Sequence, residues 1–432
     1  MPLRSALARE GEKNFASCVT SPFKSCVEYH ALAKFLARNS TSAPTTRSGD
    51  DGMVIQYKEI TLEVPLWRKG LERLLKKANE MIDRVCYGKD FGFKNPERTR
   101  DDWSNNDRGY TAFKPAAFLE HPLPLLDAML HDKALGLAAS PDGKSLVINM
   151  SKVQERMAAF TEINKTLALL VFFMSGQPGR GTEFSDCKIS NSHRPRSLFL
   201  DERANVWYVV RRVKWENITQ REVFLPKKCP PKVSDLLKKY LLIIRPVEMH
   251  FSLQIHGKGT DSADLAIHNY STFLWVRQGE RMKSRVWGEE IAVFLREECS
   301  CVDGNLSSYR HFSVEMSRIF LEDISYTGPA QQRGHSAKTA QRTYAVEADH
   351  LPMMSSDVLL CYGKWSEEWW NLTGVGPNKE LPAPFWVREE RERHGLLELK
   401  NEMGELKKLL TRVERAVGQI GRKTNLEEST SL

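Results

Sequence analysis

A long apolar segment near the middle of the chain constrains the fold most. Residues 151–174 read SKVQERMAAFTEINKTLALLVFFM, and Gly176 and Pro178 follow directly and end the pattern. Apolar side chains recur every three or four residues along one stripe, the spacing of a helix that packs against a core. The segment therefore predicts a well-buried core helix, with its stripe at Val153, Met157, Phe160, Ile163, Leu167, Leu170 and Val171.

The composition is that of a globular protein with two or three domains. The chain has 432 residues, of which 41% are hydrophobic, and 63 Lys and Arg exceed 55 Asp and Glu to give a net charge of +8. This excess suits a polyanionic partner but is also common among soluble proteins. The eight cysteines include no CxxC pair and are expected to be reduced thiols. The lone CxC at Cys299 and Cys301 predicts no metal site, because no further ligands accompany it.

The N-terminal residues MPLRSALAREGEKNF lack the apolar run of a signal peptide, and we identify no apolar run of the ~18 residues that a membrane span needs. We therefore expect an intracellular protein with no membrane partner, and a nuclear one if the source is a eukaryote.

The N-terminal part predicts a linker followed by a helical unit. Residues 38–52, RNSTSAPTTRSGDDG, are almost free of apolar side chains, so the first structured unit is expected to begin near Tyr57. Residues 67–85 have the periodicity of an amphipathic helix. Its polar face could follow DNA phosphates or be merely solvated, and it carries Arg68, Lys69, Arg73, Lys76, Lys77 and Arg84.

The remaining patterns predict an α+β fold in which helices dominate. Residues 197–201, 206–214 and 221–226 are rich in β-branched and aromatic side chains and indicate a small antiparallel sheet. Helical patterns return at 232–244 and 287–298. The tryptophans at 365, 369 and 370 are interpreted as packing. The C-terminal seam predicts a coiled coil that self-associates or docks on a partner helix, although it could also pack within the chain; it comprises Leu396, Leu399, Met403, Leu406, Leu410, Val413, Val417 and Ile420.

Three separated motifs carry the functional signal: SGQPGRGTEF at 175–184, SSYRHFSVEMSRIF at 307–320 and RGHSAKTAQRTYAV at 333–346. In order and spacing they resemble the tyrosine recombinase and integrase family. The wording of the first two is similar to the Crypton-type recombinases of eukaryotic mobile elements. The resemblance covers roughly residues 145–350.

The resemblance implies a role for each matching residue. Arg180 and Arg310 would clamp the nonbridging oxygens of the scissile phosphate, with Glu183 and His311 as supporting residues. Tyr344, nine positions after His335, would be the nucleophile, and His335 would bind the phosphate or exchange a proton. Lys214 matches the family's catalytic lysine best, with Arg211, Arg212 and Lys227 as rivals. The second motif has Ser307 where the family has a histidine, which leaves one acid/base position open.

These residue types suit phosphodiester cleavage without a cofactor. Guanidinium groups stay charged and can hold a phosphate through planar forks, so neither a metal nor a nucleotide is required. A phenol beside such cations can become a nucleophile and form a covalent intermediate that preserves the bond energy for rejoining. Arg211 and Arg212 are also candidates for DNA contact, with the basic helix face described above.

Together these observations predict four regions: a poorly ordered segment over 1–56, a helical DNA-binding domain over 57–145, a recombinase catalytic domain over 146–365 and a coiled-coil extension over 366–432. The expected function is cutting and rejoining of double-stranded DNA by a homo-oligomer, encoded by or derived from a mobile element. Three alternatives stay open: a relative that binds DNA without cutting it, a relaxing topoisomerase, and a structural oligomer built on the coiled coil.

Overall fold

The computed structural model describes Tyr29 and residues 46–49, 51–95, 101–132, 138–139, 146–147, 149–212, 223–321 and 356–429. The chain divides into two units, Met1–Thr45 and Thr46–Leu432, and the elements described below belong to the second. This unit is mostly helical with small antiparallel sheets, which confirms the predicted α+β class.

The second unit begins with a sheet of three short strands. Strands β1 (Thr46–Ser48), β2 (Val54–Tyr57) and β3 (Ile60–Glu63) pair antiparallel in that order. Strand β1 therefore begins about ten residues before the predicted start near Tyr57 and lies inside the predicted linker. An edge strand needs few apolar residues of its own, because its backbone bonds to β2 and only Ile55 of β2 is fully buried.

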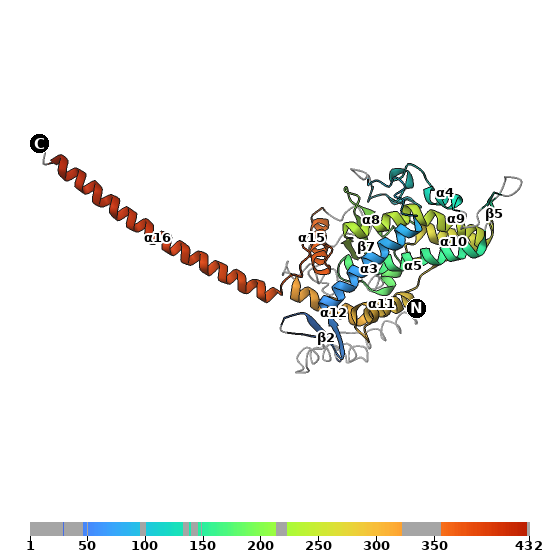
Figure 1. Cartoon of the computed structure of the whole chain (residues 1–432), viewed down its shortest axis with the longest axis horizontal. Helices are drawn as coiled ribbons and strands as arrows, with labels where there is room; N and C mark the ends of the chain where they lie inside the picture. The colour runs from blue at the N-terminus through green and yellow to red at the C-terminus, as the bar shows by residue number, and fades with distance from the viewer. Residues whose placement is uncertain are drawn as a thin grey trace, which may run out of the picture. The chain divides into compact units, whose positions relative to one another are not determined.

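Helix α3 (Val64–Val85) begins with Pro65 in its first turn, where a missing N–H breaks no helical bond. It packs against α5 (Met150–Met174) and α11 (Ser284–Cys299), and Figure 1 shows α3 in blue beside α5 in green. The approach to α11 depends on Gly70, where a Cβ would lie 3.0 Å from the Glu298 carbonyl oxygen. The two helices therefore pack closely only because position 70 has no side chain.

The shared core changes the predicted domain division. Side chains of α3, α5 and α11 belong to one hydrophobic cluster, and residues from Thr46 onward form one compact unit rather than separate domains over 57–145 and 146–365. Periodicity shows which face of a helix is buried but not which helix covers it. The boundary was therefore beyond what the pattern could reveal.

Helix α5 is buried along most of its length, as predicted. Asn149 caps its N-terminus by accepting a bond from the Lys152 N–H at 3.2 Å. Among the described residues α5 is also the one helix long and apolar enough to cross a membrane, but 78% of its most apolar window is buried inside the fold. Its apolar surface is thus occupied by neighbouring elements of the chain.

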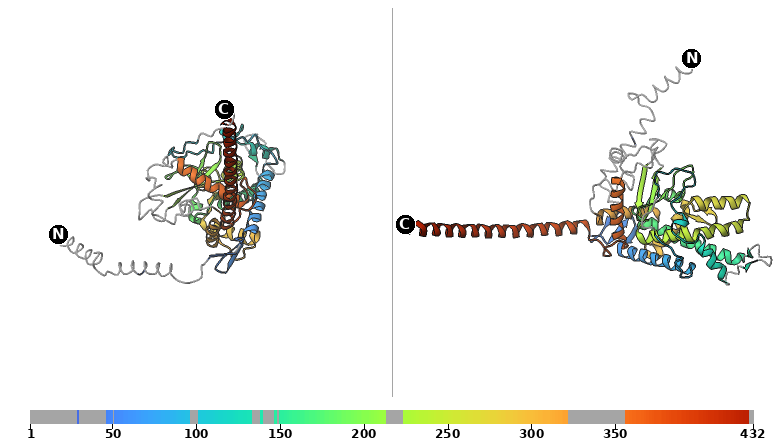
Figure 2. Two further views of the ribbon diagram at one scale, coloured as in Figure 1. Left: turned by 90° about the vertical axis from the view of Figure 1, so that its left-hand side faces the viewer. Right: turned by 90° about the horizontal axis from the view of Figure 1, so that it is seen from above.

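The predicted small antiparallel sheet is present. After the short helix α6 (Gly181–Ser185), strands β6 (Leu198–Leu200), β7 (Val206–Arg212) and β8 (Val223–Lys228) pair in that order, and Tyr208 stands opposite Lys227. The tip of the β7–β8 hairpin lies outside the described residues. Figure 2 shows these strands in green with α15 in orange against them.

Helices and short hairpins form the rest of the unit. The predicted helical patterns at 232–244 and 287–298 are confirmed. The elements not yet named are η1 (Pro115–Ala117), α4 (Pro124–His131), β4 (Ala138–Ala139), β5 (Leu146–Val147), α8 (Pro231–Lys239), the π-helical turn η3 (Tyr240–Ile244), α9 (Arg245–His256), α10 (Asp261–Thr272), β9 (Val276–Arg277), β10 (Glu280–Arg281), α12 (Leu306–Phe320), α15 (Ser356–Thr373) and α16 (Phe385–Ser429).

Helix α15 closes the core with its tryptophans. Trp365 and Trp369 are buried, and the Trp369 indole N–H donates to the Phe173 carbonyl oxygen of α5 at 2.8 Å. The interpretation of this cluster as packing is confirmed. The predicted boundary between 365 and 366 falls inside α15, because the helix belongs to the core on both sides of that point.

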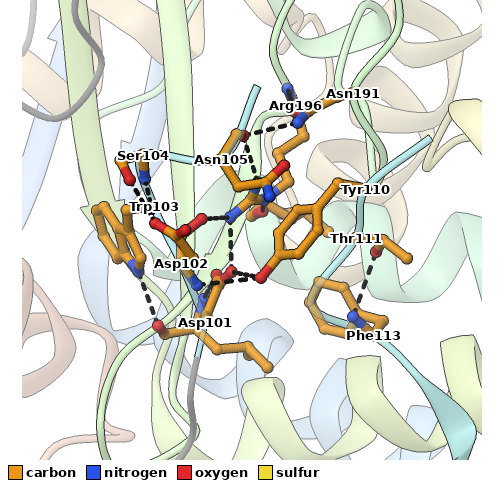
Figure 3. Close-up of polar contacts among 12 residues, drawn as sticks. Asp101, Asp102, Trp103, Ser104, Asn105, Tyr110, Thr111, Phe113, Asn191 and Arg196 are labelled. Carbon is orange, nitrogen blue, oxygen red and sulfur yellow. Dashed lines mark hydrogen bonds and ion pairs between the residues drawn. The ribbon is translucent and has the colours of Figure 1, made fainter. Parts of the chain in front are cut away.

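An irregular segment, residues 101–113, is fastened to the β6 region by one buried arginine. Figure 3 shows Arg196 reaching Asp101, whose carboxylate it meets at 2.6 Å, and both side chains are at most 1% exposed. The Arg196 guanidinium also lies over the Tyr110 ring, 4.7 Å from its centre, and Asp101 accepts the Leu200 N–H. The charges are therefore paired and hydrogen-bonded within the core.

Candidate functional site

The first predicted arginine stands on the turn between α5 and α6. Arg180 is the residue before α6, with extended backbone. Its neighbour Gly181 is packed so closely that a Cβ would lie 2.7 Å from the Ser284 Oγ and 3.4 Å from a Leu306 methyl carbon. Because Ser284 and Leu306 begin α11 and α12, this glycine lets the turn reach the N-terminal ends of both helices.

Glu183 orients Arg180, in line with the supporting role expected for it. The Glu183 carboxylate accepts the Arg180 backbone N–H at 2.9 Å and lies 3.7 Å from the guanidinium Nη1. The Glu183 side chain is 11% exposed and that of Arg180 is 28% exposed. The carboxylate therefore holds the base of the arginine while its guanidinium keeps access to solvent.

The second arginine lies close to the first. Arg310 is on α12 and is partly buried, and burial lowers its pKa; the positive charge of Arg180 lowers it further, while Glu183 raises it. The structure thus brings Arg180, Glu183 and Arg310 together from segments about 130 residues apart. These three residues comprise two guanidinium groups and one carboxylate, which leaves an excess of positive charge.

A buried lysine completes the cluster. Lys227 on β8 is 3% exposed, and its ammonium donates to the Gln177 backbone carbonyl oxygen on the turn before Arg180. Its pKa is lowered to about 7, chiefly by burial; the Glu183 charge opposes this shift and the Arg310 charge adds to it. Lys227, a rival to Lys214 as the catalytic lysine, therefore lies near Arg180 and Arg310. We call Arg180, Glu183, Lys227 and Arg310 the cationic cluster.

The other predicted catalytic residues cannot be placed against this cluster. Lys214, His335 and Tyr344 lie outside the described residues. Arg211 and Arg212 end β7, but the structure describes only their backbone.

The remainder of the second motif departs from expectation. Ser307 is exposed in the first turn of α12, where its backbone N–H donates to the Asn305 Oδ1 at 2.9 Å. His311 was expected to support Arg310, but its ring stacks on Tyr57 instead, with centroids 4.1 Å apart and planes 9° apart. Successive helical residues point about 100° apart, so His311 faces the β2–β3 hairpin.

The predicted basic face of α3 is partly used within the chain. Arg68 donates to the Lys379 carbonyl oxygen at 2.8 Å and to that of Asn371 at 3.4 Å. Arg73 pairs with Glu298 at 2.7 Å. Lys76 lies 3.8 Å from Glu80, and Lys69 and Lys77 are exposed. Arg68 therefore holds the segment after α15 rather than standing ready for DNA contact.

Comparison of the chain with models of known protein families, with curated proteins and with solved structures gives no significant match.

Two features of this region could not be predicted from the sequence: the burial of Lys227 and the contact of His311 with Tyr57. Lys227 follows Val-Phe-Leu-Pro and precedes another lysine, so it looks like the exposed end of a strand. Its ammonium is instead buried against the Gln177 carbonyl oxygen, on the turn after α5 and 50 residues earlier in the chain. The Tyr57 contact likewise joins a hairpin to a helix about 250 residues away, and no local pattern encodes such a pair.

Proposed function

We propose that the protein cuts and rejoins double-stranded DNA through a covalent tyrosine intermediate, as tyrosine recombinases do. The observation that carries the proposal is the meeting of Arg180 and Arg310 beside a single carboxylate. Two guanidinium groups with one counter-charge form a site for an anion with several oxygens, and a phosphodiester fits that description. The motif resemblance supplies the nucleophile, Tyr344.

The proposed reaction balances without a cofactor. The Tyr344 phenolic oxygen attacks phosphorus, the bond from phosphorus to the 5′ oxygen breaks, and a 3′-phosphotyrosyl ester forms. The phenolic proton passes to a base, and the leaving 5′ oxygen takes a proton from an acid. Arg180 and Arg310 neutralise the charge that develops on the nonbridging oxygens. Rejoining reverses these steps when a 5′ hydroxyl attacks the ester.

Two lysines are candidates for the proton donor. Lys214 matches the family motif, and Lys227 lies within the cationic cluster with a pKa lowered to about 7. An acid with a pKa near the working pH both holds its proton and releases it, which suits Lys227 to the task. His335 is assigned to phosphate binding or proton exchange.

A nicked DNA suicide substrate tests the proposal, because loss of the short strand after cleavage traps the covalent complex. The wild type should form a DNA–protein adduct that resists denaturation, and Tyr344→Phe should form none. Arg310→Ala should lower the rate of adduct formation by about 10²-fold or more, since it removes a charge that acts on the transition state. DNA affinity, measured in parallel, separates loss of chemistry from loss of binding.

Ser307 favours a second candidate, a protein that binds DNA without cutting it. The resemblance places an imidazole at this position, whereas the exposed serine hydroxyl does not ionise near neutral pH and so does not replace a histidine as general acid or base. A wild type that binds DNA but leaves the suicide substrate intact would support this candidate. Plasmid relaxation without recombinant products would instead indicate topoisomerase activity.

In this proposal the protein acts on DNA as a homo-oligomer, and α16 forms one of the contacts between protomers. Apolar side chains follow α16 at heptad spacing and are more than half exposed, among them Leu399, Met403, Leu406 and Leu410. Exposed apolar stripes of this kind are buried when helices associate.

A further inference from the structure

The tip of the β2–β3 hairpin lies against α12 at the residue that follows Arg310. Tyr57 pairs with Ile60 across the hairpin, so Lys58 and Glu59 form the turn. Lys58 has a φ of 55°, a left-handed conformation that glycine or asparagine adopts more readily. The hairpin thus keeps an exposed lysine at a position where a smaller residue would be less strained.

Aromatic contacts fix this tip on the helix. The Tyr57 ring is stacked on His311, and it meets the Phe312 ring edge-on at 6.5 Å with planes 83° apart. The Lys58 ammonium lies 5.5 Å from the centre of the Tyr57 ring. We call Tyr57, Lys58 and His311 the hairpin platform.

The hairpin platform continues the positive charge of the cationic cluster. The pKa of His311 is lowered by burial and then by the charges of Arg310 and Lys58. Arg310 directly precedes His311 on α12, so the hairpin platform lies beside one of the two arginines of the cationic cluster. Glu183 lies beside Arg180, and within the described part of the chain no carboxylate forms an ion pair with Lys58 or His311.

We infer that the hairpin platform binds a DNA backbone phosphate neighbouring the one that Arg180 and Arg310 hold. This inference rests on the proposed function. Phosphates repeat every ~3.4 Å of rise along one strand, so a protein surface beside a clamped phosphate meets further phosphates as a matter of geometry. Lys58 supplies the charge, and the stacked rings hold its hairpin in place without closing off the ammonium.

The salt dependence of binding to a duplex of about 30 base pairs tests the inference. Removing one charge that neutralises a phosphate makes the plot of log affinity against log salt less steep by about 0.9. Lys58→Gln should therefore reduce the slope by about 0.9 and weaken binding about fivefold at physiological salt. The control is Lys258→Gln, which removes an exposed lysine between α9 and α10 and should leave the slope unchanged.

Variants of Tyr57 separate DNA contact from support of the fold. Tyr57→Phe keeps the stacked ring and should bind DNA as the wild type does, whereas Tyr57→Ala should reduce the slope as Lys58→Gln does. If Lys58→Gln binds DNA with an unchanged slope, the inference is wrong while the proposed function stands. If the wild type itself has no affinity for duplex DNA, both are overturned.

Discussion

At the scale of single residues, the predicted site is partly recovered. Arg180, Glu183 and Arg310 were singled out by the spacing of their motifs, and the structure brings them together. Lys227 was one of three rivals to Lys214 as the catalytic lysine. The prediction that His311 supports Arg310 was wrong, because the His311 ring stacks on Tyr57. Both positions depend on contacts between segments far apart in the chain, Lys227 on the turn after α5 and β2 on α12, which local patterns do not encode.

Lys227 makes the stability of the protein depend on pH. Its folded pKa of about 7 lies below the ordinary lysine value of 10.5, so between these values the unfolded chain binds more protons than the folded one. The free energy of unfolding should therefore rise with pH over this window, by up to ~1.4 kcal/mol per unit from this group. Lys227→Met should lose that rise in denaturant titrations at about pH 7 and 9.

The exposed lysine variant Lys232→Met is the control and should keep the wild-type pH dependence. A Lys227→Met protein whose stability changes with pH as the wild type does would show that Lys227 titrates normally.

The Asp101–Arg196 pair should contribute strongly to stability. Asp101→Asn leaves the Arg196 guanidinium buried without its counter-charge, and loss of one partner of such a pair costs about 3–5 kcal/mol. The neighbouring Asp102 is exposed and its carboxylate accepts the Ser104 backbone N–H at 2.9 Å. Its bond to Arg196 is made by the backbone carbonyl oxygen, so Asp102→Asn should cost under ~1 kcal/mol. Equal denaturation midpoints for the two variants would mean that the pair is not the fastening point of segment 101–113.

At the scale of elements, the sequence predicts whether a segment is a helix or a strand better than it predicts which elements pack together. The core helix, the small sheet and the long C-terminal helix follow from periodicity, because hydrophobic spacing directly reports a helix face or a strand. The position of β1 and the absence of domain boundaries near 145 and 365 in the described residues could not be predicted from periodicity. They are set by which elements share a core, and α3 and α15 both share the core of α5.

Charges beside the α16 seam predict how two copies associate. With Met403 and Leu410 at position a and Leu406 at d, Glu402 is a g position and Lys407 the e position five residues later, a pair that attracts between parallel, in-register helices. Lys407→Glu should therefore weaken self-association by roughly tenfold, since two attractive pairs become repulsive. The double variant Glu402→Lys, Lys407→Glu should restore it.

Sedimentation of the full chain measures this effect. In an antiparallel arrangement e positions face e positions, so Lys407→Glu would exchange one like-charged pair for another and leave the association constant nearly unchanged. A chain that stays monomeric at every concentration would exclude α16 as a contact between protomers.

At the scale of the whole molecule, one claim joins these parts: a DNA phosphate held by Arg180 and Arg310 is attacked by Tyr344. The fold brings the arginines together from α6 and α12, with Lys227 of β8 and the hairpin platform beside them. In the proposed function, the charge excess of the cluster, the exposed lysine of the hairpin and the exposed α16 seam would serve one task, holding DNA between associated protomers.

Mass spectrometry of the trapped suicide-substrate adduct tests this claim most directly, because it identifies the residue bonded to DNA after proteolysis and nuclease digestion. We predict a nucleotide joined through its 3′ phosphate to Tyr344, in the peptide that follows Arg342. A nucleotide on any other residue, or DNA recovered without a covalent bond to protein, would contradict it.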